Sequence, residues 1–327
     1  MNQHLLISAV PFSTADAAPL STIKSAGISY TLNPHGRTLS EEEMISLVPG
    51  CHVIIAGTEP ITAAVMDRSP SLKLIARVGI GLDSIDLEAA HKRGIQITYT
   101  PDEPAPAVAE LTVGLAIDLL RHVSMSNRGL RKQIWDRPLG RRLSESAIGL
   151  VGVGRIGRLV GLHLRAFGAR VLCYDIAPDL QLSARDGFEW VDELDQLIEK
   201  SDILSLHVPL TEKTYHLIGV AELRRMKKSA VLINTARGGV VDETALFNAL
   251  SKGEISAAAV DVFESAPYAG RLIELDNCIL TCHLGSCSVD CHTAMELKAA
   301  EEAVRYFKGQ PLRGLIPVGT VAFNPGV

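Results

Sequence analysis

Residues 146–175 read SAIGLVGVGRIGRLVGLHLRAFGARVLCYD, and this stretch decides the fold of the chain around it. An apolar run at 147–151 leads into three glycines with the spacing G-x-G-x-x-G. Apolar residues at helical intervals follow, and a second apolar run ends at Asp175. This order predicts a strand, a tight glycine turn, a helix and a second strand, which together form one βαβ unit of a parallel sheet.

Each glycine of this turn has its own physical task. Gly152 allows the tight turn, Gly154 lets the backbone approach a pyrophosphate, and Gly157 lets the helix pack closely on the strand. The helix N-terminus adds free N–H groups and the positive end of its dipole. Asp175 lies 18 positions after Gly157 (175 minus 157), where a carboxylate can accept from both ribose hydroxyls and repel a 2′-phosphate. A turn without a ligand is the alternative, but the complete pattern favours binding of NAD.

Composition bounds the class of protein. The chain has 327 residues, enough for two domains, and its 47% hydrophobic content permits sizeable cores. The net charge of −5 gives no basic field for nucleic acid. No apolar run is long enough to span a membrane, and the N-terminus lacks the basic start of a signal peptide. We therefore expect a cytoplasmic protein without nucleic-acid or membrane partners.

The rest of the chain repeats the alternation of strands and helices. It runs through residues 1–101, and three prolines between 101 and 106 then mark a boundary. A long apolar helix is expected over Ala107–His122, and the alternation resumes over 146–285. A last helix over Thr293–Phe307 can cross back to the first domain. The predicted fold class is α/β, with parallel sheets covered by helices.

A polar arm separates the long apolar helix from the glycine turn. It covers residues 124–144 and carries Trp135 together with Arg137, Arg141 and Arg142. A solvated loop is one interpretation. An arm of this size with a tryptophan is more typical of a segment that packs on a partner subunit.

Seven blocks of sequence follow one another in a recognisable order. They are ARVGIGLDSID at 76–86, VAELTVGL at 108–115, GLVGVGRIG at 149–157, LHVPLTEKTYHLI at 206–218, INTARGGVVDE at 233–243, AAVDVFESAP at 258–267 and TCHLGS at 281–286. In this order the blocks resemble the D-isomer-specific 2-hydroxyacid dehydrogenases. The overall sequence is most similar to the phosphoglycerate dehydrogenase-like members.

The resemblance implies two flavodoxin-like or Rossmann-like doubly wound domains with the active site in the cleft between them. Residues 1–101 plus 287–327 would form the substrate domain. Residues 102–286 would form the NAD-binding domain. Family members are usually homodimers, joined through the segment that matches residues 102–145.

The resemblance also implies a catalytic trio. Arg237 can fork to the carboxylate and carbonyl of a 2-oxo acid, and its alternative is a surface pair with Asp242 or Glu243. His283 can donate a proton to the carbonyl oxygen because an imidazole titrates near neutral pH. Glu264 would hold this histidine in the correct tautomer. A lone histidine is more often a satisfied core residue, but the matching arginine and acid blocks favour catalysis.

The matched blocks supply further binding residues. Asp261 matches a family position that contacts the nicotinamide carboxamide, although a strand-end acid that caps nearby amides is a credible alternative. The implied cofactor-binding residues are Gly152, Gly154, Arg155, Ile156, Gly157, Asp175, His207, Val208, Pro209, Thr235, Ala236, Asp261 and Gly285. The implied substrate-binding residues are Arg77, Val78, Gly79, Ile80 and Gly81, whose backbone N–H groups can bind a carboxylate.

The end of the last block departs from the family pattern. Cys282 stands where the family usually has proline, which loosens the backbone leading to His283. Together with Cys287, Cys291 and His292, these residues offer soft and imidazole ligands within a short span. Their spacing is not that of a two-plus-two zinc site, so we expect no metal.

Two functional alternatives accompany hydride transfer to a 2-oxo acid. A non-catalytic NAD-sensing protein would keep the glycine turn but would not need the catalytic trio. A formate-type enzyme would have glutamine in place of Glu264.

The identity of the substrate has several alternatives. Arg77 suits a substrate with an anionic tail such as 3-phosphoglycerate, whereas Glu59 in another loop opposes a phosphate. Hydroxypyruvate, glyoxylate and a phosphonate-bearing 2-oxo acid are alternatives that stay open.

Overall fold

The computed structural model describes residues 4–317, 319–320 and 323. The chain divides into two compact units, Met1–Pro104 with Cys287–Val327, and Ala105–Ser286. From sequence the boundaries were placed after residues 101 and 286. Each unit has its own parallel sheet, which confirms the predicted α/β fold class. The assignment of substrate and cofactor to separate units stays a prediction.

The first unit contains a five-stranded parallel sheet in the order β2-β1-β3-β4-β5. This is the flavodoxin-like order, in which the direction of strand addition reverses between β1 and β3. The central strands β3 and β4 are buried along their whole length, as their continuous apolar sequences require. The strands are β1 His4–Ile7, β2 Ser29–Leu32, β3 Val53–Ala56, β4 Leu74–Arg77 and β5 Gln96–Thr98.

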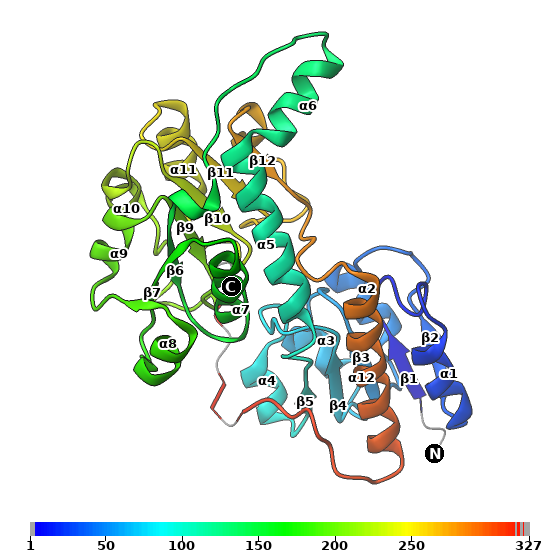
Figure 1. The fold of residues 1–327 in the computed structure, drawn as a ribbon. Helices are drawn as coiled ribbons and strands as arrows, with labels where there is room; N and C mark the ends of the chain where they lie inside the picture. Colours follow the sequence, from blue (N-terminus) through cyan, green and yellow to red (C-terminus); the bar gives the residue numbers. More distant parts are fainter. Residues whose placement is uncertain (1–3, 318, 321–322, 324–327) are drawn as a thin grey trace. The chain divides into compact units, whose positions relative to one another are not determined.

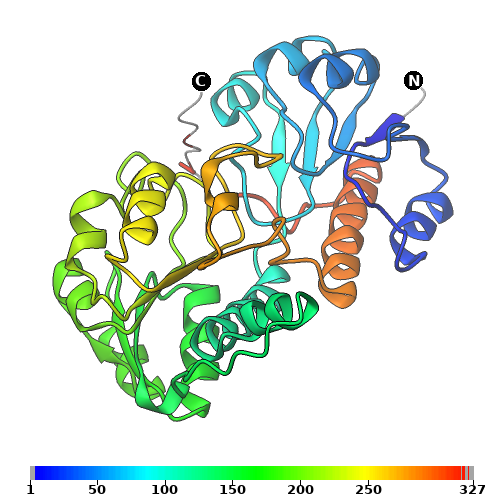
Figure 2. The ribbon, with the colours of Figure 1, turned by 90° about the horizontal axis from the view of Figure 1, so that it is seen from above.

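Helices from both ends of the chain cover this sheet. The longest of them, α12, packs against α1 and against strands β3 and β4. Figures 1 and 2 show it in orange-red beside the blue strands. Its buried side includes Met295, Ala299 and Ala303. The helices are α1 Ala18–Ser25, α2 Glu41–Leu47, α3 Ala63–Asp67, α4 Leu87–Lys92 and α12 Val289–Phe307.

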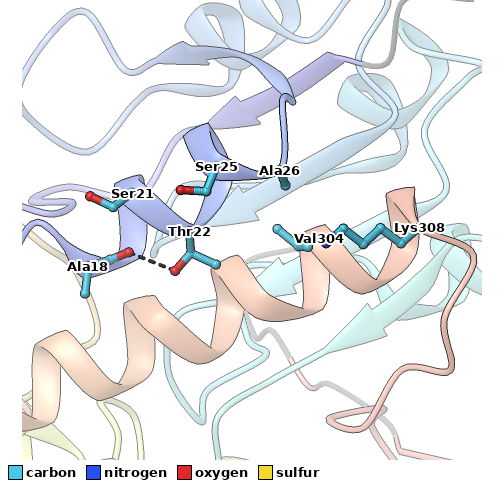
Figure 3. Close-up of a pocket in the computed structure, with 7 residues that line it drawn as sticks. All are labelled: Ala18, Ser21, Thr22, Ser25, Ala26, Val304 and Lys308. Carbon is cyan, nitrogen blue, oxygen red and sulfur yellow. Dashed lines mark hydrogen bonds between the residues drawn. The ribbon is translucent and has the colours of Figure 1, made fainter.

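A shallow groove runs between α1 and α12 within this unit (Figure 3). Thr22 lies in its wall, and its hydroxyl donates to the carbonyl oxygen of Ala18 at 2.9 Å. That bond serves the backbone of α1 itself. Lys308 closes the groove at one end (Figure 3). The groove therefore belongs to the packing of the two helices.

The second unit contains a seven-stranded parallel sheet in the order β12-β11-β10-β9-β6-β7-β8. The chain starts at β6 and builds outward to β8, then returns to the other side of β6 with β9. In such sheets ligands bind beyond the carboxyl ends of the strands at this reversal, here between β6 and β9. The strands are β6 Ala147–Val151, β7 Arg170–Tyr174, β8 Glu189–Trp190, β9 Ile203–Leu206, β10 Val231–Asn234, β11 Ala257–Val260 and β12 Cys278–Leu280.

Most helices of this unit connect successive strands. Asp242 caps α11, because its side chain accepts from the backbone N–H of Ala245 at 2.9 Å. The helices are α5 Pro104–Arg121, α6 Val123–Arg131, α7 Arg155–Ala166, α8 Leu180–Asp186, α9 Leu194–Lys200, α10 Val220–Arg225 and α11 Glu243–Ser251, with short 3₁₀ turns η1 Leu143–Glu145 and η2 Arg271–Glu274.

The predicted polar arm begins with a helix. α6 follows α5 directly and reaches past its upper end in Figure 1. None of its residues is buried. In the segment after it, Trp135 is 81% exposed and Leu139 is 98% exposed. Large apolar side chains exposed to this degree are typical of a surface that contacts another protein.

Candidate active site

The glycine turn joins β6 to α7 at the carboxyl edge of the second sheet. Gly152 has a φ of 91°, and a Cβ atom there would lie 2.7 Å from the carbonyl oxygen of His207. A Cβ on Gly157 would lie 2.1 Å from the carbonyl oxygen of Gly152. A Cβ on Gly154 would meet no protein atom within 4 Å. The fold itself therefore requires the first and third glycines, whereas the second borders open space.

Asp175 follows β7 and lies against the glycine turn. Its Oδ2 accepts from the backbone N–H of Val153 at 2.8 Å, and its Oδ1 accepts from that of Ala177 at 3.0 Å. The carboxylate is therefore held beside the turn by two backbone donors. This is the edge where the carboxylate was predicted to meet a ribose.

His207 follows β9, the strand on the other side of the reversal point. Its Nε2 lies 2.9 Å from the hydroxyl of Ser205. Its Nδ1 is buried and has no hydrogen-bond partner in the described part of the chain. Burial lowers the pKa of this imidazole to about 3, so the ring is neutral near pH 7. Val208 also lies at this turn, because a Cβ on Gly152 would be 3.0 Å from its Cγ1.

Arg237 lies three positions after the end of β10. The side chain of Asn234 shapes the intervening turn, since its Oδ1 accepts from Ala236 N–H at 3.1 Å and its Nδ2 donates to Arg237 O at 3.0 Å. The Arg237 Nη1 donates to Ala236 O at 2.7 Å. Thr235 bonds its hydroxyl to that of Thr112 on α5 at 2.9 Å. The backbone that carries the guanidinium is therefore fixed by buried polar contacts.

His283 lies in a loop that Asp261 holds in place. Asp261 is fully buried, and its Oδ1 accepts from Leu284 N–H at 2.7 Å and from the Thr281 hydroxyl at 2.6 Å. Its Oδ2 accepts from Gly285 N–H at 2.9 Å, and its carbonyl oxygen accepts from His283 N–H at 2.9 Å. His283 itself has a φ of 55°. The carboxylate thus fixes an unusual backbone conformation at the predicted acid–base residue.

Glu264 follows β11, and its carboxylate contacts a second histidine. Its Oε1 lies 3.1 Å from Nε2 of His216, in the loop after β9. Its backbone N–H donates to Oε1 of Glu243 at 2.8 Å. Burial raises the pKa of Glu243, and the nearby charge of Glu264 acts in the same direction. The predicted role of Glu264 toward His283 stays a prediction.

The predicted substrate loop of the first unit follows β4. The Arg77 guanidinium donates from Nε to Gly81 O at 2.9 Å and from Nη1 to Val78 O. Gly79 has a φ of 134°, and its N–H donates to the Thr100 hydroxyl at 2.8 Å. Arg77 is 8% exposed, and its guanidinium lies inside this loop. From the sequence we expect the side chain to lie beside the loop. Ile80 lies between these contacts and is half-buried.

A comparison with known protein families identifies this arrangement. The profile "D-isomer specific 2-hydroxyacid dehydrogenase, NAD binding domain" matches residues 113–285. The chain belongs to the D-isomer-specific 2-hydroxyacid dehydrogenases. The matched range contains the seven-stranded sheet and its glycine turn. This confirms NAD as the cofactor and the predicted oxidoreductase activity of an NAD-dependent dehydrogenase.

Individual relatives support the same family. The glyoxylate reductase of Thermofilum pendens is 43% identical over 277 residues, which cover 82% of this chain and 81% of that protein. The D-3-phosphoglycerate dehydrogenase of Methanocaldococcus jannaschii is 38% identical over 277 residues, which cover 83% of this chain but only 53% of that protein. The crystal structure of D-lactate dehydrogenase from Aquifex aeolicus, complexed with NAD and lactic acid, superposes with a TM-score of 0.83 at 28% identity, covering 94% of this chain and 96% of that one.

The geometry of this dehydrogenase fits the cofactor. Gly154 borders open space at the N-terminus of α7, where pyrophosphate can approach the backbone and the helix dipole. At the same reversal of strand order, the buried Nδ1 of His207 has no hydrogen-bond partner among the described residues. Arg155 and Ile156, which begin α7, border this approach. A negatively charged dinucleotide is the kind of ligand that such an edge accepts.

The cysteines of the dehydrogenase form no disulfide. Cys282 and Cys287 are exposed, whereas Cys51, Cys173 and Cys278 are among the buried ones. Burial raises the pKa of the Cys278 thiol to about 12, so it stays protonated. In the part of the chain that the structure describes, no three or more His, Cys, Asp or Glu side chains gather in a way that could hold a metal ion.

No helix among the described residues is both long enough and apolar enough to cross a bilayer.

The supporting roles of several residues at this edge were not predicted from the sequence. Asn234, Thr112 and Ser205 are polar residues in or beside buried strands and helices, and each supports a predicted residue. His216 stands in a matched block, but its contact lies 48 positions further along the chain. The long-range partners of Thr112 and His216 become visible only in the folded chain.

Proposed function

We propose that this dehydrogenase uses NADH to reduce a short 2-oxo acid, glyoxylate or hydroxypyruvate, to the corresponding 2-hydroxy acid. The observation that carries this choice is the position of Arg77. Its Nε and Nη1 bind the carbonyl oxygens of its own loop. We infer that the guanidinium orders the loop of residues 78–81, which favours a substrate without a charged tail.

A buried acid near the same sheet edge supports a substrate without a phosphate. Glu59 follows β3, the neighbour of β4, and is 1% exposed. Its Oε1 accepts from Gly57 N–H at 2.8 Å and from the hydroxyl of Ser8. A carboxylate fixed at this edge repels a phosphate dianion. The 43% identity with a protein named glyoxylate reductase points in the same direction.

The residues of the second unit supply the chemistry of this reduction. Arg237 forks to the substrate carboxylate and carbonyl oxygen, which orients the acid and polarises the carbonyl. His283 donates its proton to the carbonyl oxygen, and Glu264 stabilises the imidazolium before that transfer. Bound NADH supplies the hydride that reaches the carbonyl carbon. One 2-oxo acid, one hydride and one proton thus give one 2-hydroxy acid, and His283 regains its proton from solvent.

A specific observation favours 3-phosphoglycerate as the second candidate substrate. The D-3-phosphoglycerate dehydrogenase of M. jannaschii is 38% identical, although this chain spans about half of its length. A phosphate tail would compete with the carbonyl oxygens of this loop for the Arg77 guanidinium. We therefore rank this substrate second.

We infer a homodimer from the apolar side chains that are exposed on the polar arm. Leu130 on α6 is 57% exposed, and Trp135 and Leu139 are more exposed still. A second copy of the chain that packs on residues 102–145, which include this arm, would remove these side chains from water. Light scattering on the purified protein tests this. Replacement of Trp135 and Leu139 by serine is expected to shift the mass towards the monomer.

The substrate proposal is tested by measuring NADH consumption with glyoxylate, hydroxypyruvate and 3-phosphohydroxypyruvate. We expect the two short acids to have the higher kcat/KM. Arg237→Ala is expected to lower kcat/KM for both by about 10²-fold or more, as loss of an oriented charged contact does. A preference for 3-phosphohydroxypyruvate would reverse the ranking of substrates. A chain that binds NADH but turns over none of the three would instead support the NAD-sensing alternative.

A further inference from the structure

His216 and Glu264 form a contact for which the mechanism above has no role. Nε2 of His216 lies 3.1 Å from Oε1 of Glu264, and the two side chains are 34% and 37% exposed. The contact joins the loop after β9 to the loop after β11. Glu264 is the acid proposed to stabilise His283. A side chain that hydrogen-bonds to this carboxylate is therefore in a position to influence the proton transfer from His283.

The backbone of His216 is held in an unusual conformation. Its φ is 51°, in the left-handed region that few non-glycine residues adopt. Its N–H donates to the carbonyl oxygen of Gly239 at 2.7 Å. Its ring stacks on that of Tyr215, with centroids 4.0 Å apart. Such a conformation persists only where the surroundings fix it, and here the surroundings include the segment that follows Arg237.

Glu264 is anchored independently of this histidine. Its backbone N–H donates to Glu243 at 2.8 Å. A Cβ on Gly238 would lie 1.8 Å from the carbonyl oxygen of Phe263, so the backbone after Arg237 runs directly against the backbone before Glu264. The main chain of Glu264 is thus fixed, and its side chain is oriented by what binds the carboxylate.

We propose that His216 is a positioning residue that orients the Glu264 carboxylate for its work on His283. This inference rests on the proposed function. A carboxylate has two oxygens, each able to accept hydrogen bonds. The His216 ring holds Oε1, which directs Oε2 to a second donor, the His283 imidazole. Without the first contact the side chain samples several rotamers and stabilises the His283 imidazolium less.

Two further titratable groups lie beside Glu264. Glu243 accepts from the backbone N–H of Glu264 at 2.8 Å, and burial raises the pKa of its carboxyl group. Tyr268 interacts with Glu243, and burial raises the pKa of its phenol as well. Both groups belong to the electrostatic environment of the contact between Glu264 and His216.

The test compares two substitutions at one position. His216→Asn keeps a residue that tolerates the left-handed backbone but withdraws the donor from Glu264. His216→Gln keeps a donor with comparable reach. We expect His216→Asn to lower kcat about 3- to 10-fold, the usual effect of one lost hydrogen bond, with an unchanged KM for NADH. The descending limb of kcat against pH for reduction moves to lower pH. His216→Gln restores both, and His91→Ala, on an exposed histidine of α4, changes neither.

A second readout does not depend on turnover. In protein labelled with ¹³C-histidine, the ring signal of His283 is followed against pH by NMR. We expect its titration midpoint to move to lower pH in His216→Asn and to return in His216→Gln. Unchanged kcat, pH profile and midpoint in His216→Asn would overturn the proposal, as would a loss of kcat in which the midpoint stays fixed. If the wild type reduces none of the 2-oxo acids, the proposed function fails and the midpoint alone decides the role of His216.

Discussion

The glycine turn at residues 152–157 and the histidine loop at residues 281–285 lie at the same edge of one sheet, yet different forces fix them. In the turn, backbone sterics leave no choice, since a Cβ on Gly157 would lie 2.1 Å from a carbonyl oxygen. In the loop, the buried carboxylate of Asp261 takes three donors from a distant part of the chain. The conformation of a turn that is fixed by sterics can be predicted from its glycines. The conformation of a loop that is fixed by a remote side chain can be recognised only in the folded structure.

The largest expected effect concerns the chemistry of the loop. His283→Ala is expected to lower kcat for 2-oxo acid reduction by about 10²- to 10⁴-fold, because the proton donor is lost. NADH affinity is expected to stay the same, because the glycine turn is untouched. Steady-state kinetics and NADH fluorescence titration measure the two effects. Cys282→Ala, at the exposed neighbouring residue, is the matched control, and an equal loss there would assign the effect to loop geometry instead.

Substitutions at two glycines of the turn are expected to have different effects, one on the stability of the fold and the other on the binding of NADH. Gly157→Ala forces a Cβ against backbone and is expected to lower the free energy of unfolding by about 1–3 kcal/mol, the usual cost of overpacking. Gly154→Ala places its Cβ in open space and is expected to change it by less than about 0.5 kcal/mol. It is nevertheless expected to weaken NADH binding by about tenfold, or about 1.4 kcal/mol. Denaturant unfolding and NADH titration on both variants provide the check. Equal NADH affinity in Gly154→Ala and wild type would argue against pyrophosphate at this turn.

Asp261 is expected to be structurally indispensable for the histidine loop. Asp261→Asn replaces one acceptor oxygen by an NH₂ group that faces backbone donors, and is expected to lower the free energy of unfolding by about 1–3 kcal/mol. Thr281→Val removes one donor only and is expected to have the smaller effect, about 1 kcal/mol. Urea unfolding with a kcat measurement on each variant tests the order. If Thr281→Val were the worse of the two, the carboxylate would not be the centre of the loop.

The smallest expected effect is a pH dependence of stability from His207. Burial lowers the pKa of its imidazole to about 3 in the folded chain, whereas a histidine in the unfolded chain titrates near 6.5. Below about pH 6.5 this histidine binds a proton in the unfolded chain but not in the folded chain. Its contribution to the free energy of unfolding is therefore fully present above that pH and is lost as the pH falls towards 3. His207→Gln is expected to flatten this decline between pH 6.5 and 5 in urea unfolding. An identical slope in wild type and variant would mean that the ring is not buried as described.

Secondary structure could be predicted from the sequence where local chemistry decides it. The strand, turn, helix and strand predicted for residues 146–175 match β6, α7 and β7. Prediction failed where the signal is weak or distant. The arm at residues 124–144 begins with the helix Val123–Arg131, which buries no side chain and was not predicted as a helix. α12 begins at Val289, whereas the sequence predicts a start at Thr293. The first turn of the helix, residues 289–292, carries no periodic apolar pattern that would indicate it.

The candidate site divides in the same way. Arg237, Glu264 and His283 were predicted from motifs, and their roles stay predictions. The environments of Glu264 and His283 were not predictable, because His216 and Asp261 act through contacts that depend on strand order. The contact of Asn234 with Arg237 is local to one turn, but no motif indicated it. Arg77 is the instructive case. Its place in the sequence suggests a substrate contact, which stays a prediction. The structure adds that its guanidinium binds carbonyl oxygens of its own loop, which the sequence did not indicate.

The most direct test of the account is the fate of the hydride. The enzyme is incubated with hydroxypyruvate or glyoxylate and NADH that carries deuterium at C4, prepared as both C4 epimers, and the product is analysed by NMR and chiral chromatography. We expect that one epimer transfers deuterium to C2 of the hydroxy acid, and that hydroxypyruvate gives only the D-isomer. Product without deuterium from either epimer, or product of the L-configuration, would contradict it.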